Sequence, residues 1–209
     1  MDSRRRRIAA AATGLGMAML AAGCGTPPWQ ESTSPTPTAP ISVSATPAPA
    51  PSNDLARGSL KRTLTAGAAR LEVNYWSTLD LRQWTPEVPK PLNLVVSGTL
   101  QGGAKGQQIF LSAVRVASIA SAADGTPHVL DAADDVATVA PGYLISKPNS
   151  YQQVLTLPAA PAGSTALTVT LTYELLIQSQ PKSDAFLRQA TSDTIQVPLV
   201  TAAAPTTSP

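Results

Sequence analysis

Apolar and polar residues alternate with a period of two through much of the chain after residue 59. The clearest segment is 167–177, in which the odd positions are Leu, Val, Leu, Tyr, Leu and Ile, and the even positions up to Glu174 are Thr or Glu. Such alternation is typical of a β-strand with one face on a core and one face toward water. Helical apolar spacing extends over no more than about two turns anywhere. The pattern therefore predicts an all-β domain.

The same alternation predicts further strands at residues 71–75, 92–100, 109–119, 151–157 and 195–199, with shorter ones at 129–130 and 136–139. In 109–119 the apolar face shifts near Ala113, as a β-bulge allows. Turn residues such as Gly102-Gly103 and Pro141-Gly142 separate the segments.

Seven or eight short strands of this kind predict an antiparallel two-sheet sandwich of immunoglobulin-like type. Strands of a parallel sheet would be apolar on both faces, which the alternation excludes. No Cys…Trp…Cys pattern is present, so a true antibody-type domain is excluded as well. We place this domain at residues 59–201.

The composition changes sharply before residue 59. Residues 25–58 contain eight prolines among Ser, Thr and Ala, and cannot bury enough apolar surface to offset the entropy of ordering. We therefore expect residues 24–58 to form a disordered stalk, which at about 3.1 Å per residue extends to at most about 100 Å. Residues 202–209 repeat this Ala-, Pro- and Thr-rich composition, and we expect them to form a short disordered tail. Whether the Thr/Pro pattern carries O-linked sugar is left open.

The first 23 residues have the parts of a secretory signal. Arg4 to Arg7 form a positive segment, and the apolar residues 8–20 are too few for a membrane span, which needs about 20. Leu20-Ala21-Ala22-Gly23-Cys24 follows and holds the only cysteine of the chain. This run resembles a bacterial lipobox, although Ala21 stands where many lipoboxes have Leu. The resemblance implies cleavage before Cys24 and attachment of lipid, including palmitate, to that residue.

The lipobox, the stalk, the heavy use of Ala and the excess of Arg over Lys together resemble small lipoproteins of actinobacterial type. The resemblance implies a lipid anchor at Cys24 and a place on the extracytoplasmic face of the cell membrane. It does not extend to the domain. The alternative for the leader is ordinary secretion with cleavage near Ala22 and a free thiol. Export by the general or the twin-arginine route is left open by Ser3-Arg4-Arg5.

Charge and cysteine content limit the partners and the chemistry. The chain has 15 basic and 13 acidic residues, and removing the leader, with its four arginines and one aspartate, leaves 11 and 12. This near-neutral balance predicts no nucleic-acid partner and no electrostatic attraction to an anionic membrane. A single cysteine excludes an intrachain disulfide. We predict no cofactor.

The candidate site residues are few. His128, the only histidine, lies in a turn-like sequence and is interpreted as a solvated loop residue, so a His-rich zinc site and a Ser-His-Asp triad are not expected. The acidic residues Asp124, Asp131, Asp134 and Asp135 predict either a solvated loop or a calcium site, but their spacing does not match an EF-hand.

Aromatic residues supply the other candidates. Trp76 and Trp84 are either plugs at the end of the core or a ligand patch that binds a sugar or a partner protein. Phe186 is expected in a loop or single helical turn between residues 181 and 193, where its ring caps the core.

Two functions of different class follow. The first is a non-catalytic envelope module that binds a protein, glycan or small ligand, or serves as an accessory subunit. The second is an extracellular glycan hydrolase that uses two carboxylates drawn from the acidic group together with Glu72, Glu87 and Glu174. We expect the first, because no catalytic set is evident in the sequence.

Overall fold

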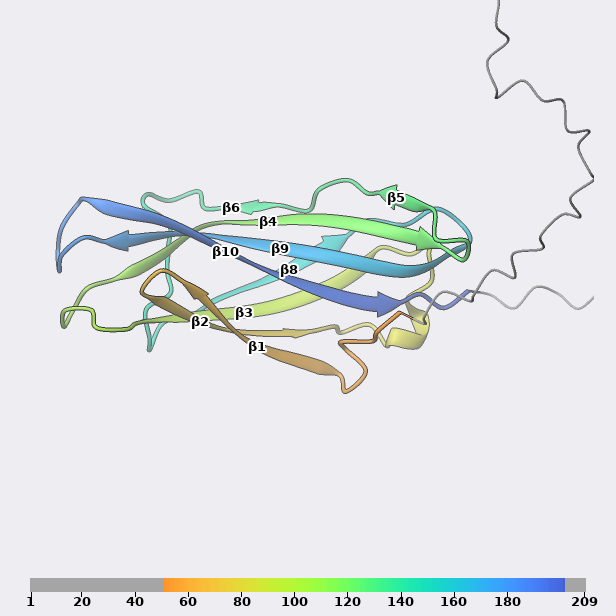
Figure 1. Ribbon diagram of the computed structural model, residues 1–209, viewed down its shortest axis with the longest axis horizontal. Coiled ribbons are helices and arrows are strands. Elements are labelled where there is room, and N and C mark those ends of the chain that lie inside the picture. Colours follow the sequence, from red (N-terminus) through yellow and green to blue (C-terminus); the bar gives the residue numbers. More distant parts are fainter. Residues whose placement is uncertain (1–50, 202–209) are drawn as a thin grey trace, which may run out of the picture. The chain divides into compact units, whose positions relative to one another are not determined.

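A computed structural model describes residues 51–201 of the chain. This part is an all-β sandwich of two antiparallel sheets, as the alternation predicts (Figure 1). Sheet A has the order β1-β2-β3-β8, and sheet B has the order β10-β9-β4-β5, with β6 and β7 also paired to β4. The immunoglobulin-like subtype stays a prediction. The strands are β1 Ser59–Ala66, β2 Ala69–Trp76, β3 Lys90–Leu100, β4 Ile109–Ala122, β5 Pro127–Val129, β6 Asp135–Val136, β7 Tyr143–Leu144, β8 Tyr151–Leu157, β9 Ser164–Gln178 and β10 Phe186–Pro198.

The core lies between the sheets and is built from the alternating apolar positions. In β9 the residues Leu167, Val169, Leu171, Tyr173 and Leu175 are all 1% exposed or less, whereas the threonines between them are partly exposed. The inward positions of β2 and β3 meet them from sheet A. The apolar face of β4 shifts at Ser112, where the register with β9 skips from Leu111 to Ala113. The predicted bulge near Ala113 is therefore confirmed.

Sequence pattern missed two stretches of strand. β1 carries Arg62 between Leu60 and Leu64, so its alternation is interrupted, and it forms a hairpin with β2. The prediction of a loop or helical turn around Phe186 was wrong. Phe186 begins β10, which pairs residue by residue with β9, and its half-buried ring packs edge-on against Phe110 with centroids 5.8 Å apart. Pairing with a strong neighbouring strand orders this segment despite its polar sequence.

The packed part of the chain begins before Ser59. Leu55, which the sequence pattern assigns to the stalk, is 1% exposed and belongs to the core. The Asp54 N–H donates to the Gln196 carbonyl over 2.9 Å, and the Gln196 N–H donates to the Asp54 carboxylate over 2.8 Å. Asp54 thereby pairs with the exposed edge of β10 near its C-terminal end. The predicted signal peptide, most of the predicted stalk and the predicted tail after residue 201 lie outside the described residues.

Helical structure is minor in residues 51–201. One short 3-10 helix, η1 Leu81–Gln83, begins after Asp80, whose side chain accepts a hydrogen bond from the Arg82 N–H. No helix of this part of the chain has the length and apolar character needed to cross a membrane.

Candidate functional site

The two tryptophans of the predicted ligand patch have different environments. Trp84 follows η1 and is 0% exposed, and its Nε1 donates to the Ser77 hydroxyl over 3.3 Å. Trp76 is partly exposed at the end of β2, on the outer face of sheet A, opposite Asn93. Trp84 is thus a plug at the end of the core and presents no ring to a ligand. A patch formed jointly by the two rings is not present.

The four acidic residues between 124 and 135 face separate partners. Asp124 accepts from the Thr126 N–H within its own turn, and Asp134 accepts from the Val116 N–H over 2.8 Å and from Arg115 over 3.1 Å. Asp135 accepts from the Tyr151 hydroxyl and from the Gln153 amide, while Asp131 is exposed. Within residues 51–201, no group of three or more His, Cys, Asp or Glu side chains is placed to hold a metal ion.

Of the remaining carboxylates of the hydrolase alternative, Glu174 shares Arg115 with Asp134, whereas Glu72 lies on the other sheet. Glu174 lies on the outer face of β9 and pairs with Arg115 at 3.1 Å. Glu72 lies on the outer face of sheet A and pairs with Lys147 at 2.6 Å. His128 is not in a loop, as its sequence context suggests, but in the short edge strand β5, where it is opposite Ala120 and partly buried. The backbone of His128 pairs with the last part of β4, because the other short strands on this edge, β6 and β7, pair only with the first part of β4.

Lys90 is a buried cation that sequence pattern did not single out. Its side chain is 0% exposed, and its Nζ donates to the carbonyls of Pro86 at 3.0 Å and Val88 at 2.5 Å. Burial lowers the pKa of Lys90, because the charged form loses water, and nearby Glu87 partly opposes this. Lys90, the first residue of β3, therefore holds the backbone of the preceding residues 86–88 in place through its side chain.

Lys90→Met is expected to destabilise the domain by about 1–3 kcal/mol, because it removes two hydrogen bonds from a charged donor while keeping most of the side-chain volume. Urea unfolding followed by Trp fluorescence measures the change in free energy. Lys105→Met, at an exposed position of the β3–β4 loop, is the matched control. It should leave the free energy of unfolding within about 0.5 kcal/mol of the wild-type value. Equal free energies of unfolding for the two variants would contradict a stabilising role of Lys90.

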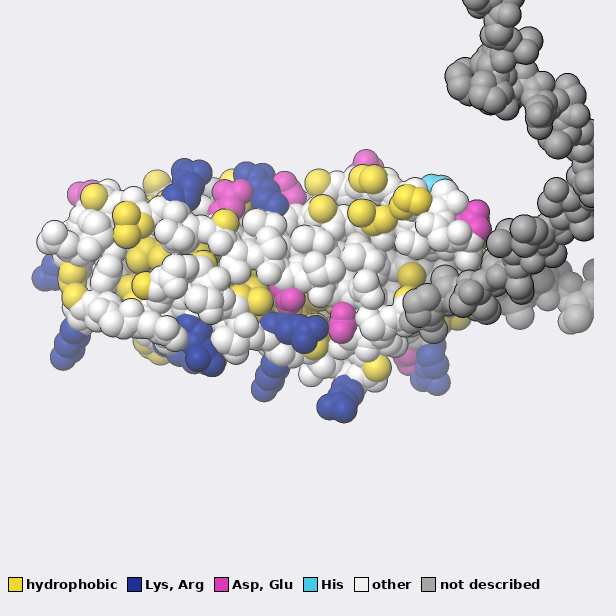
Figure 2. Space-filling view, in the orientation of Figure 1, with side chains coloured by type: hydrophobic (Ala, Val, Ile, Leu, Met, Phe, Trp, Pro, Cys, Tyr) yellow, Lys and Arg dark blue, Asp and Glu magenta, His cyan; other side chains and the backbone are white. Residues whose placement is uncertain are grey.

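The charges of the domain are segregated between its two sheets. Residues 51–105 and 145–157, which build sheet A and its connections, contain eight Lys or Arg and four Asp or Glu. Residues 106–144 and 158–201, which build sheet B, contain three Lys or Arg and seven Asp or Glu. Figure 2 shows Lys and Arg side chains along the side of β1 and β2, and most of the Asp and Glu side chains on the opposite side. The near-neutral total therefore conceals a basic face.

A hollow lies on the outer face of sheet A. It has a volume of about 340 Å³, and its outward-facing side chains are Lys61 and Thr63 of β1, Glu72 and Asn74 of β2, and Val95 and Ser97 of β3. These side chains share one face because each pair is directly opposite across the sheet. The Asn74 Oδ1 atom is buried and accepts no hydrogen bond from the described residues.

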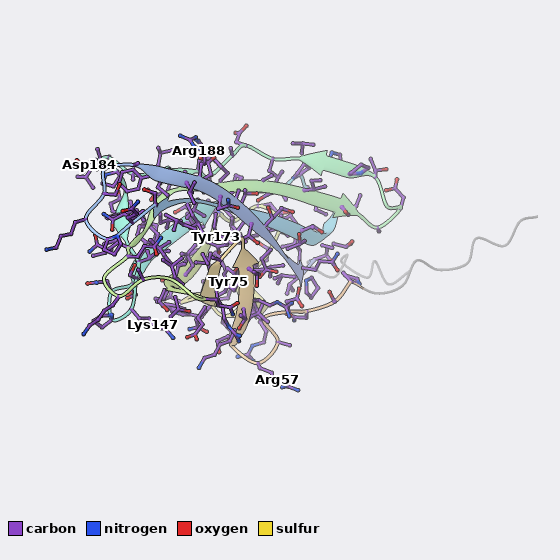
Figure 3. All side chains as sticks on the ribbon, turned by 60° about the vertical axis from the view of Figure 1, so that its left-hand side comes forward. Arg57, Tyr75, Lys147, Tyr173, Asp184 and Arg188 are labelled. Carbon is purple, nitrogen blue, oxygen red and sulfur yellow. The ribbon has the colours of Figure 1, made fainter. Side chains whose placement is uncertain are left out.

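Cations surround the single carboxylate of this face. Glu72 is the only Asp or Glu in the four strands of sheet A. A hydrogen bond from Lys147, together with the charges of Lys147, Arg70 and Lys61, lowers the pKa of Glu72 below its usual value. Figure 3 shows Lys147 and Arg57 on the side of sheet A, away from Asp184 and Arg188 on the side of sheet B. We call the group Lys61, Arg70, Glu72 and Lys147, with the hollow beside it, the sheet A site.

Three larger hollows are less suited to bind a ligand. The smallest of the three, of about 380 Å³, lies at the start of β1, where the Asp54 carboxylate already pairs with Arg62 at 3.4 Å. Another, of about 550 Å³, lies beside η1, where Asp80 and Arg82 already neutralise each other at 2.7 Å. The third, of about 650 Å³, lies near Pro51 and the end of β9, and its lining contains no charged side chain. Among these hollows, the one of the sheet A site also has the unpartnered Asn74 Oδ1 atom beside its charged residues.

No protein-family model and no curated protein sequence matches this chain. The candidate site therefore rests on the residues and geometry of this chain alone.

Proposed function

We propose that the chain is a lipoprotein of the cell envelope, anchored through lipid on Cys24, and that its β-sandwich is a non-catalytic binding or accessory module. The anchor and the location are supported by the basic segment Arg4 to Arg7, the short apolar segment and the lipobox-like run that ends in Cys24. Two acyl chains hold a protein stably at a bilayer, whereas one gives only marginal binding.

The observation that carries the binding role is the sheet A site. It offers a hollow on an open sheet face with one polar atom, Asn74 Oδ1, that has no hydrogen-bond partner among the described residues. The hydrolase alternative would need two carboxylates about 5–9.5 Å apart that face a common substrate. The carboxylates of the described residues support binding better. Asp134 and Glu174 lie near each other, but Arg115 pairs with both and neutralises them. Glu72 and Asp135 have other partners, Lys147 and Gln153.

Cys24→Ala is expected to move most of the protein from the membrane fraction to the soluble fraction, because the acyl chains are the proposed attachment. Labelling cells with radioactive palmitate should mark the wild-type protein and not the variant. Thr26→Ala is the matched control, since it changes the neighbouring sequence and keeps the cysteine. Tight membrane retention of Cys24→Ala after removal of the signal peptide would contradict the anchor.

A further inference from the structure

The sheet A site has the composition of a surface that binds anions. Three cationic side chains, Lys61, Arg70 and Lys147, surround Glu72, and all four belong to exposed residues. Lys147 extends across β3 to Glu72, which leaves Lys61 and Arg70 without a carboxylate partner within 4.0 Å among the described residues. The face therefore carries a net positive charge next to the hollow. An anionic ligand gains from both cations without displacing an existing ion pair.

The hollow itself favours a ligand rich in hydroxyl groups. Its polar lining presents Thr63, Asn74 and Ser97 above Val95, whose side chain is partly exposed. The buried Asn74 Oδ1 needs a hydrogen-bond donor, which carboxylate and phosphate groups lack and which a sugar hydroxyl supplies. The hydroxyl groups of Thr63 and Ser97 and the apolar side chain of Val95 also match the O–H and C–H groups of a sugar ring.

The direction of the site suits a polymer. The pairs Lys61–Asn74, Asn74–Val95 and Val95–Gln152 run in one row across all four strands of sheet A. This row has no strand or loop covering it in the described residues, since its outer ends, Lys61 and Gln152, are both exposed. A chain of sugars can therefore lie along this row with one ring in the hollow and an acidic group near Lys61. Arg70 is four residues from Asn74 along β2, to the side of the row, and faces acidic groups of the same ligand beyond the hollow.

From this geometry we infer that the outer face of sheet A binds an anionic polysaccharide. The inference rests on the proposed binding function and names the class of ligand for that module. The ligand is recognised by two features together: regularly spaced acidic groups, which pair with Lys61 and Arg70, and sugar hydroxyls, which donate to Asn74. An acidic polypeptide shares the first feature and offers backbone N–H groups as donors, but it has no ring with hydroxyl groups to fill the hollow.

The test measures binding of the full chain, purified in a mild non-ionic detergent, to immobilised polygalacturonate. Dextran serves as the neutral glycan and polyglutamate as the anionic polymer without sugar. We expect polygalacturonate to bind at least tenfold more tightly than either. We also expect its dissociation constant to rise about tenfold between about 50 and 300 mM NaCl, because salt screens exposed charges.

Three variants locate the site. The double variant Lys61→Gln with Arg70→Gln should weaken binding about tenfold, since it removes both unpaired cations. Lys182→Gln with Arg188→Gln removes the same charge from exposed positions in the β9–β10 connection and in β10 of sheet B, and should change binding less than about twofold. Thr63→Trp keeps every charge but fills the hollow, and should also weaken binding about tenfold. Thermal melting checks that each variant is folded.

Several results would overturn the inference. Equal binding to polyglutamate would identify an acidic polypeptide as the ligand class, and equal loss in the two double variants would show that the sheet A site is not the binding surface. Failure of the wild type to bind polygalacturonate at low salt would exclude the anionic polysaccharide. None of these results bears on membrane release of Cys24→Ala, so failure of the ligand assignment is distinguishable from failure of the proposed lipoprotein function.

Discussion

Above about pH 10 the domain is expected to lose stability steeply, because two tyrosines are buried side by side in its core. Tyr173 donates to the Tyr75 hydroxyl over 2.9 Å, and Tyr75 donates to the Asp193 carboxylate over 3.0 Å (Figure 3). Both side chains are 0% exposed. Burial is the main cause that raises the pKa of both phenols above the usual value, and the Asp193 carboxylate adds to it.

The sign of the effect follows from proton binding in the two states. In the unfolded chain tyrosine ionises near pH 10, whereas in the folded domain Tyr75 and Tyr173 stay protonated at higher pH. Their contribution to stability is therefore complete below pH 10 and is lost as the pH rises above it. Each group changes the free energy of unfolding by about 1.4 kcal/mol per pH unit, so the two together change it by about 2.7 kcal/mol per unit. A domain with about 5 kcal/mol of stability, at the lower end of the usual range, then begins to unfold about two pH units above pH 10.

Phenolate absorbance at 295 nm and far-ultraviolet circular dichroism measure this transition in parallel. Absorbance from the buried tyrosines should appear only as the sheet signal is lost. The double variant Tyr75→Phe with Tyr173→Phe should have a shallower dependence of unfolding free energy on pH above 10. Tyr143→Phe leaves both buried hydroxyls in place and should keep the wild-type dependence. Ionisation of all four tyrosines in the folded domain near pH 10 would contradict the prediction.

Trp84→Ala is expected to destabilise the domain by about 3–5 kcal/mol, a large fraction of its total stability. The indole is fully buried at the end of the sandwich and packs with the core. Its removal leaves a cavity that backbone contacts keep open, because the Trp84 carbonyl accepts from the Val200 N–H over 2.9 Å and the preceding turn is held by η1. Replacement also leaves the Ser77 hydroxyl without its indole donor.

Urea unfolding gives the free-energy change, and Trp76→Ala is the matched control. Trp76 is partly exposed on the outer face of sheet A, so its loss is expected to cost only about 1 kcal/mol. The contrast between the two variants tests which tryptophan is the core plug. A larger loss for Trp76→Ala than for Trp84→Ala would reverse the assignment.

Much of the fold was predictable because local alternation and burial agree. Residues 167–177 form the centre of β9, 92–100 fall within β3, and the bulge near Ala113 lies where the apolar face of 109–119 shifts. β1 and the first half of β10 were not predictable in this way. Their own alternation is weak, and they are strands because long neighbours, β2 and β9, supply the hydrogen-bond partners.

The candidate site was only partly predictable. Pattern alone singled out Trp76 and Trp84 as a pair, but η1 directs Trp84 into the core and strand β2 leaves Trp76 on the outer face. Lys61, Arg70 and Lys147 carried no signal, since single cations on alternating strands look like ordinary solvated residues. The excess of basic residues before residue 106 was visible in the sequence, although its meaning depended on which segments form one sheet.

The all-β class and the antiparallel pairing could be inferred from the residues in order along the chain, and the same order predicts a leader and a stalk, because each of these inferences depends on sequence over short distances. The tertiary structure alone decided which side chains share a surface. Antiparallel pairing places Lys61 opposite Asn74 and Thr63 opposite Glu72, and the crossing of Lys147 over β3 adds a residue from far along the chain. Net charge sums over the whole chain without regard to position, so only the folded arrangement reveals a basic sheet A and an acidic sheet B.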